Sequence, residues 1–153
     1  QALEDLARSK PSRGLVHVTY ALAEELRGKL SPRFLFHRSD NKSQQLSAWL
    51  RSEDKILVGA GLSEGLDLAY DKARWQVVAK VVYPNIADPA VFQKARSRPE
   101  WYQWSAVKTL LQATGRVCRG PEDFGETFVL DDTFERLYDT NLHLFPSWFK
   151  VTR

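Results

Sequence analysis

Two arginines, a glutamine and a glycine stand at fixed spacing in the stretch from Gln112 to Gly120, which reads Q-A-T-G-R-V-C-R-G. The arginine side chain is charged at every physiological pH and can bond two oxygens of one phosphate group. Gln112, Arg116 and Arg119 are spaced i, i+4, i+7, so a continuous helix would present them on one face. The stretch therefore suits phosphate binding, although the same pattern also fits a solvated basic helix face.

A long helix from about residue 99 to residue 119 is predicted to carry these side chains. Its expected core stripe consists of Trp104, Val107, Leu111, Thr114 and Cys118. That stripe lies roughly 125° from the arginine face, so one face can be buried while the other meets a ligand. Gly115 costs about 1 kcal/mol relative to alanine inside a helix. We expect it to be tolerated because backbone or ligand comes close.

A second candidate is the glycine-rich loop 59–68, G-A-G-L-S-E-G-L-D-L, which follows an apolar strand. Glycines let the backbone approach a ligand, and Ser63, Glu64 and Asp67 add polar groups. Acidic residues beside a phosphate usually hold a cation, a water or a neighbouring arginine. The alternative is a tight connection whose acidic side chains are solvated.

Strands alternate with helices along nearly the whole chain. Strands are predicted at 15–20, 33–37, 55–59, 76–82 and 126–130, and helices at 1–9, 21–30, 89–95, 99–119 and 132–138. A further helix is predicted to start with Asp40 or Asn41 as its cap and to have Leu46, Trp49 and Leu50 on its apolar face. This alternation favours an α/β sandwich with helices on both faces of a mostly parallel sheet. Ligands of such sheets gather at the carboxyl ends of the strands, where the loop 59–68 is expected.

Composition narrows the class of protein. The chain has 153 residues and a net charge of +3, which fits one domain with a mildly basic surface. Its single cysteine, Cys118, excludes a disulfide, zinc or iron–sulfur framework built within this chain. No apolar run approaches the length of a transmembrane helix, so we expect no membrane partner. The chain begins without methionine, and we expect it to be a fragment of a larger protein.

Three motifs together resemble those of superfamily 2 helicases. S-E-G-L-D-L (63–68) resembles motif V, Q-A-T-G-R-V-C-R (112–119) resembles motif VI, and G-L-V-H-V-T-Y (14–20) stands where motif IV is expected. The acidic turn and glycine after motif VI, followed by a strand and an aspartate, resemble the DinG/XPD (Rad3-like, DEAH-type) family. The likeness covers roughly residues 14–137, and the joint order of the motifs makes it specific.

The resemblance implies that residues 1–153 form the second, C-terminal RecA-like domain of a helicase motor, with a three-layer α/β/α sandwich. ATP with Mg²⁺ would be bound mainly by the N-terminal RecA-like domain, since this chain has no Walker A sequence and no DEAH box. Arg116 and Arg119 would be arginine fingers reaching the γ-phosphate, and Gln112 would contact the nucleotide or the hydrolytic water. By the same resemblance, Glu64, Gly65, Asp67 and Gly115 would belong to the nucleotide-binding site. Thr19, Tyr20 and Ser63 would lie toward the nucleic-acid backbone.

The implied function is an ATP-dependent DNA helicase acting on single-stranded DNA, in DNA repair, in the cytoplasm or in the nucleoid or nucleus. The isolated domain should be inactive. One alternative is a non-catalytic nucleic-acid-binding or scaffold domain that keeps the fold, and another is a duplex translocase that does not separate strands. We expect structural roles for His17, His37 and His143, because they lack metal-ligand spacing.

Two further sets of side chains are expected to pack rather than react. Cys118 is predicted to be a small buried hydrophobe. Trp101, Tyr102 and Trp104 could stack on single-stranded bases, but packing within the domain is the favoured interpretation.

Overall fold

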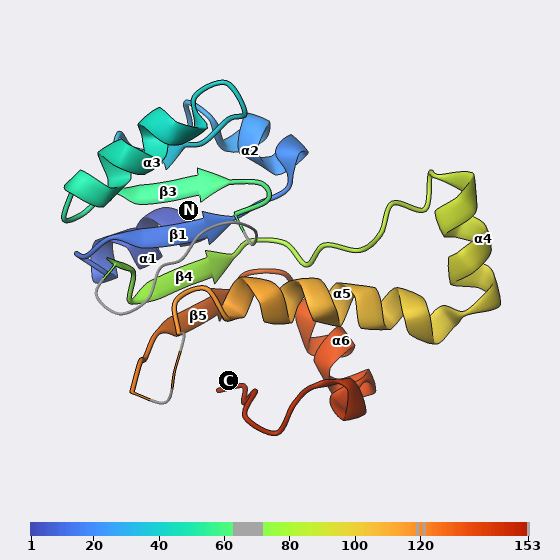
Figure 1. Ribbon diagram of the computed structural model, residues 1–153. Helices are drawn as coiled ribbons and strands as arrows, with labels where there is room; N and C mark the ends of the chain where they lie inside the picture. Colours follow the sequence, from blue (N-terminus) through green and yellow to red (C-terminus); the bar gives the residue numbers. More distant parts are fainter. Residues whose placement is uncertain (63–71, 119, 121, 153) are drawn as a thin grey trace. The chain divides into compact units, whose positions relative to one another are not determined.

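The computed structural model describes residues 1–62, 72–118, 120 and 122–152 (Figure 1). They form two compact units. The first, called the sheet unit, comprises Gln1–Lys80 and Gln112–Leu130; the second, called the helical unit, comprises Val81–Leu111 and Asp131–Arg153.

The sheet unit is built on five parallel strands in the order β2-β3-β1-β4-β5. Their bounds are β1 Gly14–His17, β2 Phe34–Phe36, β3 Ile56–Gly59, β4 Trp75–Val78 and β5 Glu126–Val129. The five predicted strands are confirmed, each shorter than expected. The strand arrows in Figure 1 point the same way, so the carboxyl ends of the strands share one edge.

Helices cover both faces of this sheet. Two helices, α1 (Ala2–Ser9) and α2 (Tyr20–Leu26), pack on the face of the sheet that carries Val16 and Val77. Helix α3 Lys42–Arg51 packs on the opposite face through Trp49, which is fully buried and donates from Nε1 to the Gly14 carbonyl at 3.1 Å. The three-layer α/β/α prediction is confirmed.

Two strands end several residues before their predicted ends, and the hydrogen bonds at those ends explain why. The strand expected at 15–20 ends at His17, because Thr19 caps α2 by accepting the Leu22 amide at 3.2 Å. The strand expected at 76–82 ends at Val78. Beyond it, the Val81 amide donates to the Asp131 carboxylate at 2.8 Å instead of to a neighbouring strand.

The helical unit contains α4 Pro89–Ser97, most of α5 Pro99–Thr114, α6 Thr133–Thr140 and a short 3-10 helix, η2 Leu142–Leu144. The predicted start of α4 is confirmed, since the Asp88 carboxylate accepts the amides of Ala90 and Val91. Aromatic rings supply much of the packing. Tyr83 stacks on Tyr102 with ring centroids 5.3 Å apart, which agrees with a packing role for Tyr102.

Candidate functional site

The end of helix α5 determines where Arg116 lies in the stretch 112–119, called here the arginine motif. The helix ends at Thr114, five residues before the predicted end, and the Arg116 amide closes the last turn on the Ala113 carbonyl at 3.1 Å. Gly115 directly follows Thr114, and glycine is the weakest helix former after proline. The predicted helix face through Gln112, Arg116 and Arg119 is therefore wrong: Gln112 is exposed in the last turn, and Arg116 follows the helix.

The same early end corrects the predicted core stripe. Cys118 is exposed, because the helical period no longer applies at its position. Val117 is buried instead, at 1% exposure. Trp104 is also off the core, with 42% of its surface exposed, while Ala106, Val107, Leu110 and Ala113 are buried.

Arg116 is half-buried in the sheet unit beside the carboxyl end of β1. Its neighbour there is His17, the last residue of β1, which is itself buried. Burial lowers the pKa of the His17 imidazole, a hydrogen bond to Gln76 opposes this change, and the positive charge of Arg116 lowers the pKa further. The site thus pairs one fixed cation with a histidine that is kept neutral, so its net charge favours an anion.

A buried amide links three strands and the end of α5. The Oε1 atom of Gln76, on β4, accepts a hydrogen bond from His17 Nε2 at 2.8 Å. The Nε2 atom of Gln76 donates to the Thr114 carbonyl at 3.0 Å and to the Thr127 hydroxyl at 2.9 Å. Gln76 and Thr127 are register partners on β4 and β5, so their side chains share a face.

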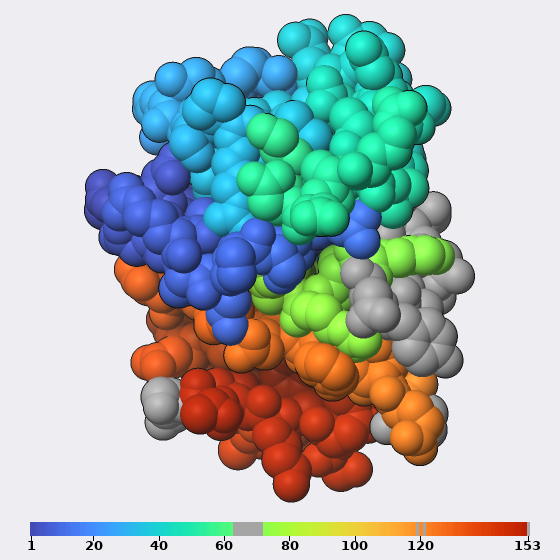
Figure 2. Space-filling model, turned by 90° about the vertical axis from the view of Figure 1, so that its left-hand side faces the viewer, coloured from blue at the N-terminus to red at the C-terminus, as the bar shows by residue number. Residues whose placement is uncertain are grey.

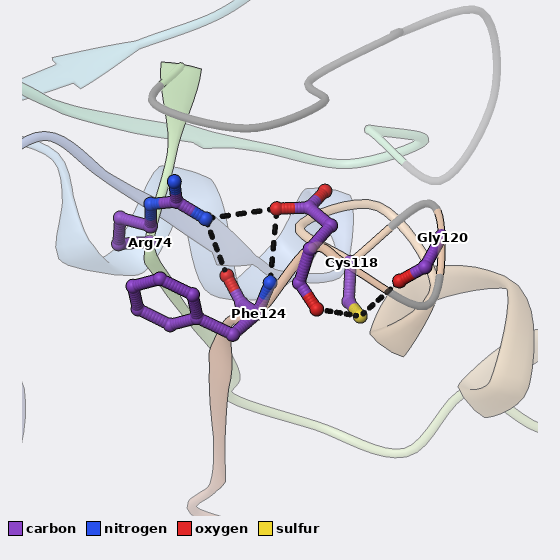
Figure 3. Close-up of polar contacts among 5 residues, drawn as sticks. Arg74, Cys118, Gly120 and Phe124 are labelled. Atoms are coloured by element: carbon purple, nitrogen blue, oxygen red, sulfur yellow. Dashed lines mark hydrogen bonds and ion pairs between the residues drawn. The ribbon is translucent and has the colours of Figure 1, made fainter.

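The turn after the arginine motif is anchored to the start of β4 (Figure 3). Arg74 Nη1 donates to the Asp123 carboxylate at 2.8 Å and to the Phe124 carbonyl at 3.0 Å. The Arg74 guanidinium also lies over the Phe124 ring, 4.0 Å from its centroid. The Asp123 side chain is 1% exposed and that of Arg74 is 27% exposed, so the carboxylate of this ion pair is shielded from solvent and the guanidinium is partly open to it.

Two further contacts close the same turn. The Cys118 thiol lies 3.3 Å from the Asp123 carbonyl, within reach of a weak hydrogen bond (Figure 3). Gly125 packs so tightly that an added Cβ atom would stand 2.6 Å from a methyl of Val117 and 2.9 Å from its carbonyl oxygen. The polypeptide on both sides of residues 119–122 is therefore held in place by Arg74, Cys118 and this glycine contact.

Two predicted nucleic-acid residues lie at the same edge of the sheet. Thr19 is the N-cap of α2, and its hydroxyl can still donate a hydrogen bond while it accepts the Leu22 amide. Tyr20 is 78% exposed. The predicted site residues Ser63, Glu64, Gly65, Asp67 and Arg119 lie outside the described residues.

The opposite edge of the sheet carries a polar hollow of about 380 Å³. It is lined by Ser12, Arg13, Leu50, Arg51, Ser52, Glu53 and Arg74, and Figure 2 views the molecule from this side. Arg13 is used structurally there, because it donates to the Leu50 carbonyl at 2.5 Å and its guanidinium lies 5.6 Å from the centre of the Trp49 ring. The hollow lies at the amino ends of the strands, whereas His17, the neighbour of Arg116, ends β1 at the carboxyl edge.

Within the ranges that the structure describes, no group of three or more His, Cys, Asp or Glu side chains could hold a metal ion. In those same ranges, no helix is both long enough and apolar enough to cross a membrane.

Sequence reasoning missed four residues of this site: His17, Gln76, Arg74 and Asp123. One signal was available for Gln76, which is a lone amide in an otherwise apolar strand. A buried polar group needs partners, so such a residue predicts a buried hydrogen-bond network. No comparable signal existed for the pairing of Arg74 with Asp123, which are 49 residues apart.

Comparison with known proteins identifies the family to which this chain belongs. Residues 3–152 match a family model described as "Helicase C-terminal domain". Regulator of telomere elongation helicase 1 of Rattus norvegicus is 36% identical over 104 residues, which cover 58% of this chain and 8% of that protein. Its homolog in Caenorhabditis elegans is 33% identical over 107 residues, which cover 60% of this chain and 10% of that protein. The chain thus spans 8% to 10% of the length of these relatives.

Solved structures with the same fold are also found. The structure called XPD_APO superposes with a TM-score of 0.76 at 23% identity, covering 93% of this chain and 33% of that chain. A second, Structure of S. tokodaii Xpd4, gives a TM-score of 0.64 at 17% identity, covering 99% and 33%. The predicted RecA-like fold is confirmed by this likeness.

Proposed function

The chain belongs to the helicase C-terminal domain family, of the XPD/DinG-like superfamily 2 type, and from that premise we propose that it is the second motor domain of an ATP-dependent DNA helicase. The observation that carries the proposal is the position of Arg116. This arginine follows the end of α5 at the carboxyl edge of a parallel sheet, beside a neutral buried histidine. Ligands of parallel α/β sheets bind at this edge.

Arg116 suits a phosphate group that another domain holds. ATP would supply the γ-phosphoryl group, and Mg²⁺ would neutralise part of its charge. A guanidinium aimed at that group stabilises charge that develops during transfer and can be worth about 10³–10⁵ in rate. We assign the magnesium ion mainly to the N-terminal RecA-like domain of the longer protein, since the sequence of this chain has no Walker A motif and no DEAH box.

The remaining motif residues receive roles on the same premise. We assign Arg119 as a second arginine finger, and Gln112, exposed in the last turn of α5, as a contact to the nucleotide or the hydrolytic water. Gly115 would allow the nucleotide close to the backbone. Glu64, Gly65 and Asp67 would couple the nucleotide site to the bound strand.

A track for single-stranded DNA is proposed along the same edge, over Thr19, Tyr20 and Ser63. The Thr19 hydroxyl can donate to a phosphate oxygen, and the exposed Tyr20 ring can stack on a base or bond the backbone. Replacing Tyr20 with alanine should therefore weaken single-stranded DNA binding by about 1–3 kcal/mol if the ring stacks on a base. Fluorescence anisotropy with a labelled oligonucleotide measures this change, and unchanged affinity would remove Tyr20 from the track.

The direct experiment uses the longer protein that contains this chain. We expect ATP hydrolysis that single-stranded DNA stimulates, and separation of a duplex with a single-stranded tail. The Arg116→Ala variant should lose both activities, whereas the control Arg51→Ala should keep them, because Arg51 is an exposed arginine at the opposite edge of the sheet. This chain alone should hydrolyse no ATP.

The two alternatives give different results in the same assays. A non-catalytic binding or scaffold domain predicts no DNA-stimulated hydrolysis in the longer protein, with or without Arg116. A duplex translocase predicts hydrolysis stimulated by double-stranded DNA and no strand separation.

A further inference from the structure

Gln76 is unusual because it is a fully buried amide in the middle of a parallel strand. Its neighbours on β4, Trp75 and Val77, are buried apolar residues that belong to the core on the opposite face. Burying an amide without hydrogen bonds is unfavourable by several kcal/mol. A residue of this kind is therefore tolerated only where its donors and its acceptor all meet partners.

The partners of Gln76 determine how its amide is oriented. The Thr114 carbonyl can only accept, so the atom 3.0 Å from it must be the amide nitrogen. The amide oxygen then faces His17 Nε2 at 2.8 Å, which requires a hydrogen on that ring nitrogen. Because burial and the charge of Arg116 both lower the pKa of His17, the ring is the neutral tautomer with its hydrogen on Nε2.

The carbonyl that Gln76 binds is a helix end. Thr114 is the last residue of α5, and the final carbonyls of a helix have no partner within the helix. The preceding carbonyl, that of Ala113, accepts the Arg116 amide at 3.1 Å. Two consecutive carbonyls at this helix end are thus fixed, one by the sheet and one by the arginine's own backbone.

We propose that Gln76, oriented by His17, is a positioning residue that joins the sheet to the end of α5 and so sets the direction of Arg116. The path is short, since Arg116 is two residues beyond the carbonyl that Gln76 holds. His17 contributes by fixing the Gln76 oxygen. Thr127 only satisfies the second amide hydrogen, at 2.9 Å, and is not part of the link to α5. The inference rests on the proposed function of Arg116 and adds the element that aligns it.

A positioning role and a purely structural role make different predictions. A residue that only stabilises the fold changes the fraction of folded protein and leaves the turnover of each folded molecule unchanged. A residue that aligns an arginine finger changes turnover, because a misplacement of about 1 Å can reduce a rate about 10²-fold. Nucleotide affinity should change little, since the other domain holds most of the nucleotide.

The test compares two substitutions in the longer protein. Gln76→Met keeps the size of the side chain and removes both donors, whereas Thr127→Val removes one partner of Gln76 and leaves its bond to Thr114. We expect Gln76→Met to lower kcat for DNA-stimulated ATP hydrolysis at least about tenfold, with KM for ATP within about twofold of the wild type. Thr127→Val should keep kcat within about twofold.

A second readout needs no nucleotide. Hydrogen exchange of the Arg116 amide should be faster in Gln76→Met than in Thr127→Val, because the end of α5 loses its hydrogen bond to the sheet.

If Gln76→Met does not fold, Gln76→Asn replaces it in the test, since asparagine keeps an amide but is shorter by one methylene. The same results are expected for it.

The outcomes separate this inference from the proposed function. Wild-type kcat and wild-type exchange in a folded Gln76 variant would overturn the positioning role alone. A loss of kcat in Thr127→Val equal to that in Gln76→Met would also overturn it, because the bond to Thr114 would then not be the deciding contact. Full hydrolysis in Arg116→Ala would overturn the proposed function itself.

Discussion

Replacing Arg74 with alanine is expected to destabilise the sheet unit and the turn that follows the arginine motif. The substitution removes the 2.8 Å ion pair to Asp123, the bond to the Phe124 carbonyl and the contact with the Phe124 ring. The Asp123 carboxylate, whose side chain is 1% exposed in the intact protein, would lose this cation and would keep the Phe124 amide at 3.0 Å. Breaking one side of a buried ion pair typically costs 3–5 kcal/mol.

Because Asp123 keeps the Phe124 amide and the Arg74 side chain is 27% exposed, the expected loss lies at the lower end, about 3 kcal/mol in the free energy of unfolding. For a chain of this size that corresponds to a fall in Tm of about 6–12 °C. Urea unfolding followed by tryptophan fluorescence measures the first quantity, and calorimetry measures the second. A double variant, Arg74→Met with Asp123→Leu, should recover part of the loss, because neither charge is then buried alone.

The matched control is Arg8→Ala. Arg8 forms an ion pair with Asp5 at the same 2.8 Å distance, but the two side chains are 69% and 53% exposed. Exposed pairs contribute about 0–1 kcal/mol, so this variant should unfold almost as the wild type does. The reasoning is refuted if Arg74→Ala loses no more stability than Arg8→Ala.

Two further predictions concern the sheet unit. The pKa of His17 is lowered in the folded protein, chiefly by burial, so the unfolded chain binds a proton more readily below about pH 6.5 and stability falls as the pH drops through that window. Urea unfolding at pH 7.5 and 5.5 should show a smaller pH-dependent loss in His17→Phe than in the wild type; some loss should remain because the pKa of His37 is also lowered, by burial and by Lys42. In Gly14→Ala, the new Cβ atom would lie 2.3 Å from the Trp75 ring, which should destabilise the protein by about 1–3 kcal/mol through overpacking. Gly120→Ala is its control, because no atom of the residues that the structure describes lies within 4 Å of the added atom, and equal losses in both variants would contradict the packing argument.

The sequence predicted the sheet well because its signal is local. Apolar, β-branched runs alternate with helical periods, and this alternation determines a parallel α/β sandwich whatever the lengths of the strands. The predicted lengths of β1 and β4 were too long because a polar side chain binds the backbone just beyond each strand. Thr19 starts a helix where the apolar run alone would continue β1, and Asp131 binds the chain beyond β4 from 50 residues away.

The candidate site was less predictable, for a related reason. The helical period continues in the sequence through Arg119, so periodicity alone extends α5 across Gly115. What ends the helix is partly non-local, because Gln76 on β4 binds its last carbonyl. The types of residue at the site could be recognised from the motifs, but their arrangement depends on contacts between distant segments.

The central claim is that Arg116 stabilises charge on a nucleotide that another domain holds. Its most direct test is single-turnover hydrolysis of ATP by the longer protein saturated with single-stranded DNA, with the dissociation constant for ATP measured in parallel. The account predicts that Arg116→Ala lowers the rate of the chemical step by about 10³-fold or more while the dissociation constant changes by less than about threefold. A wild-type rate of hydrolysis in Arg116→Ala would contradict it.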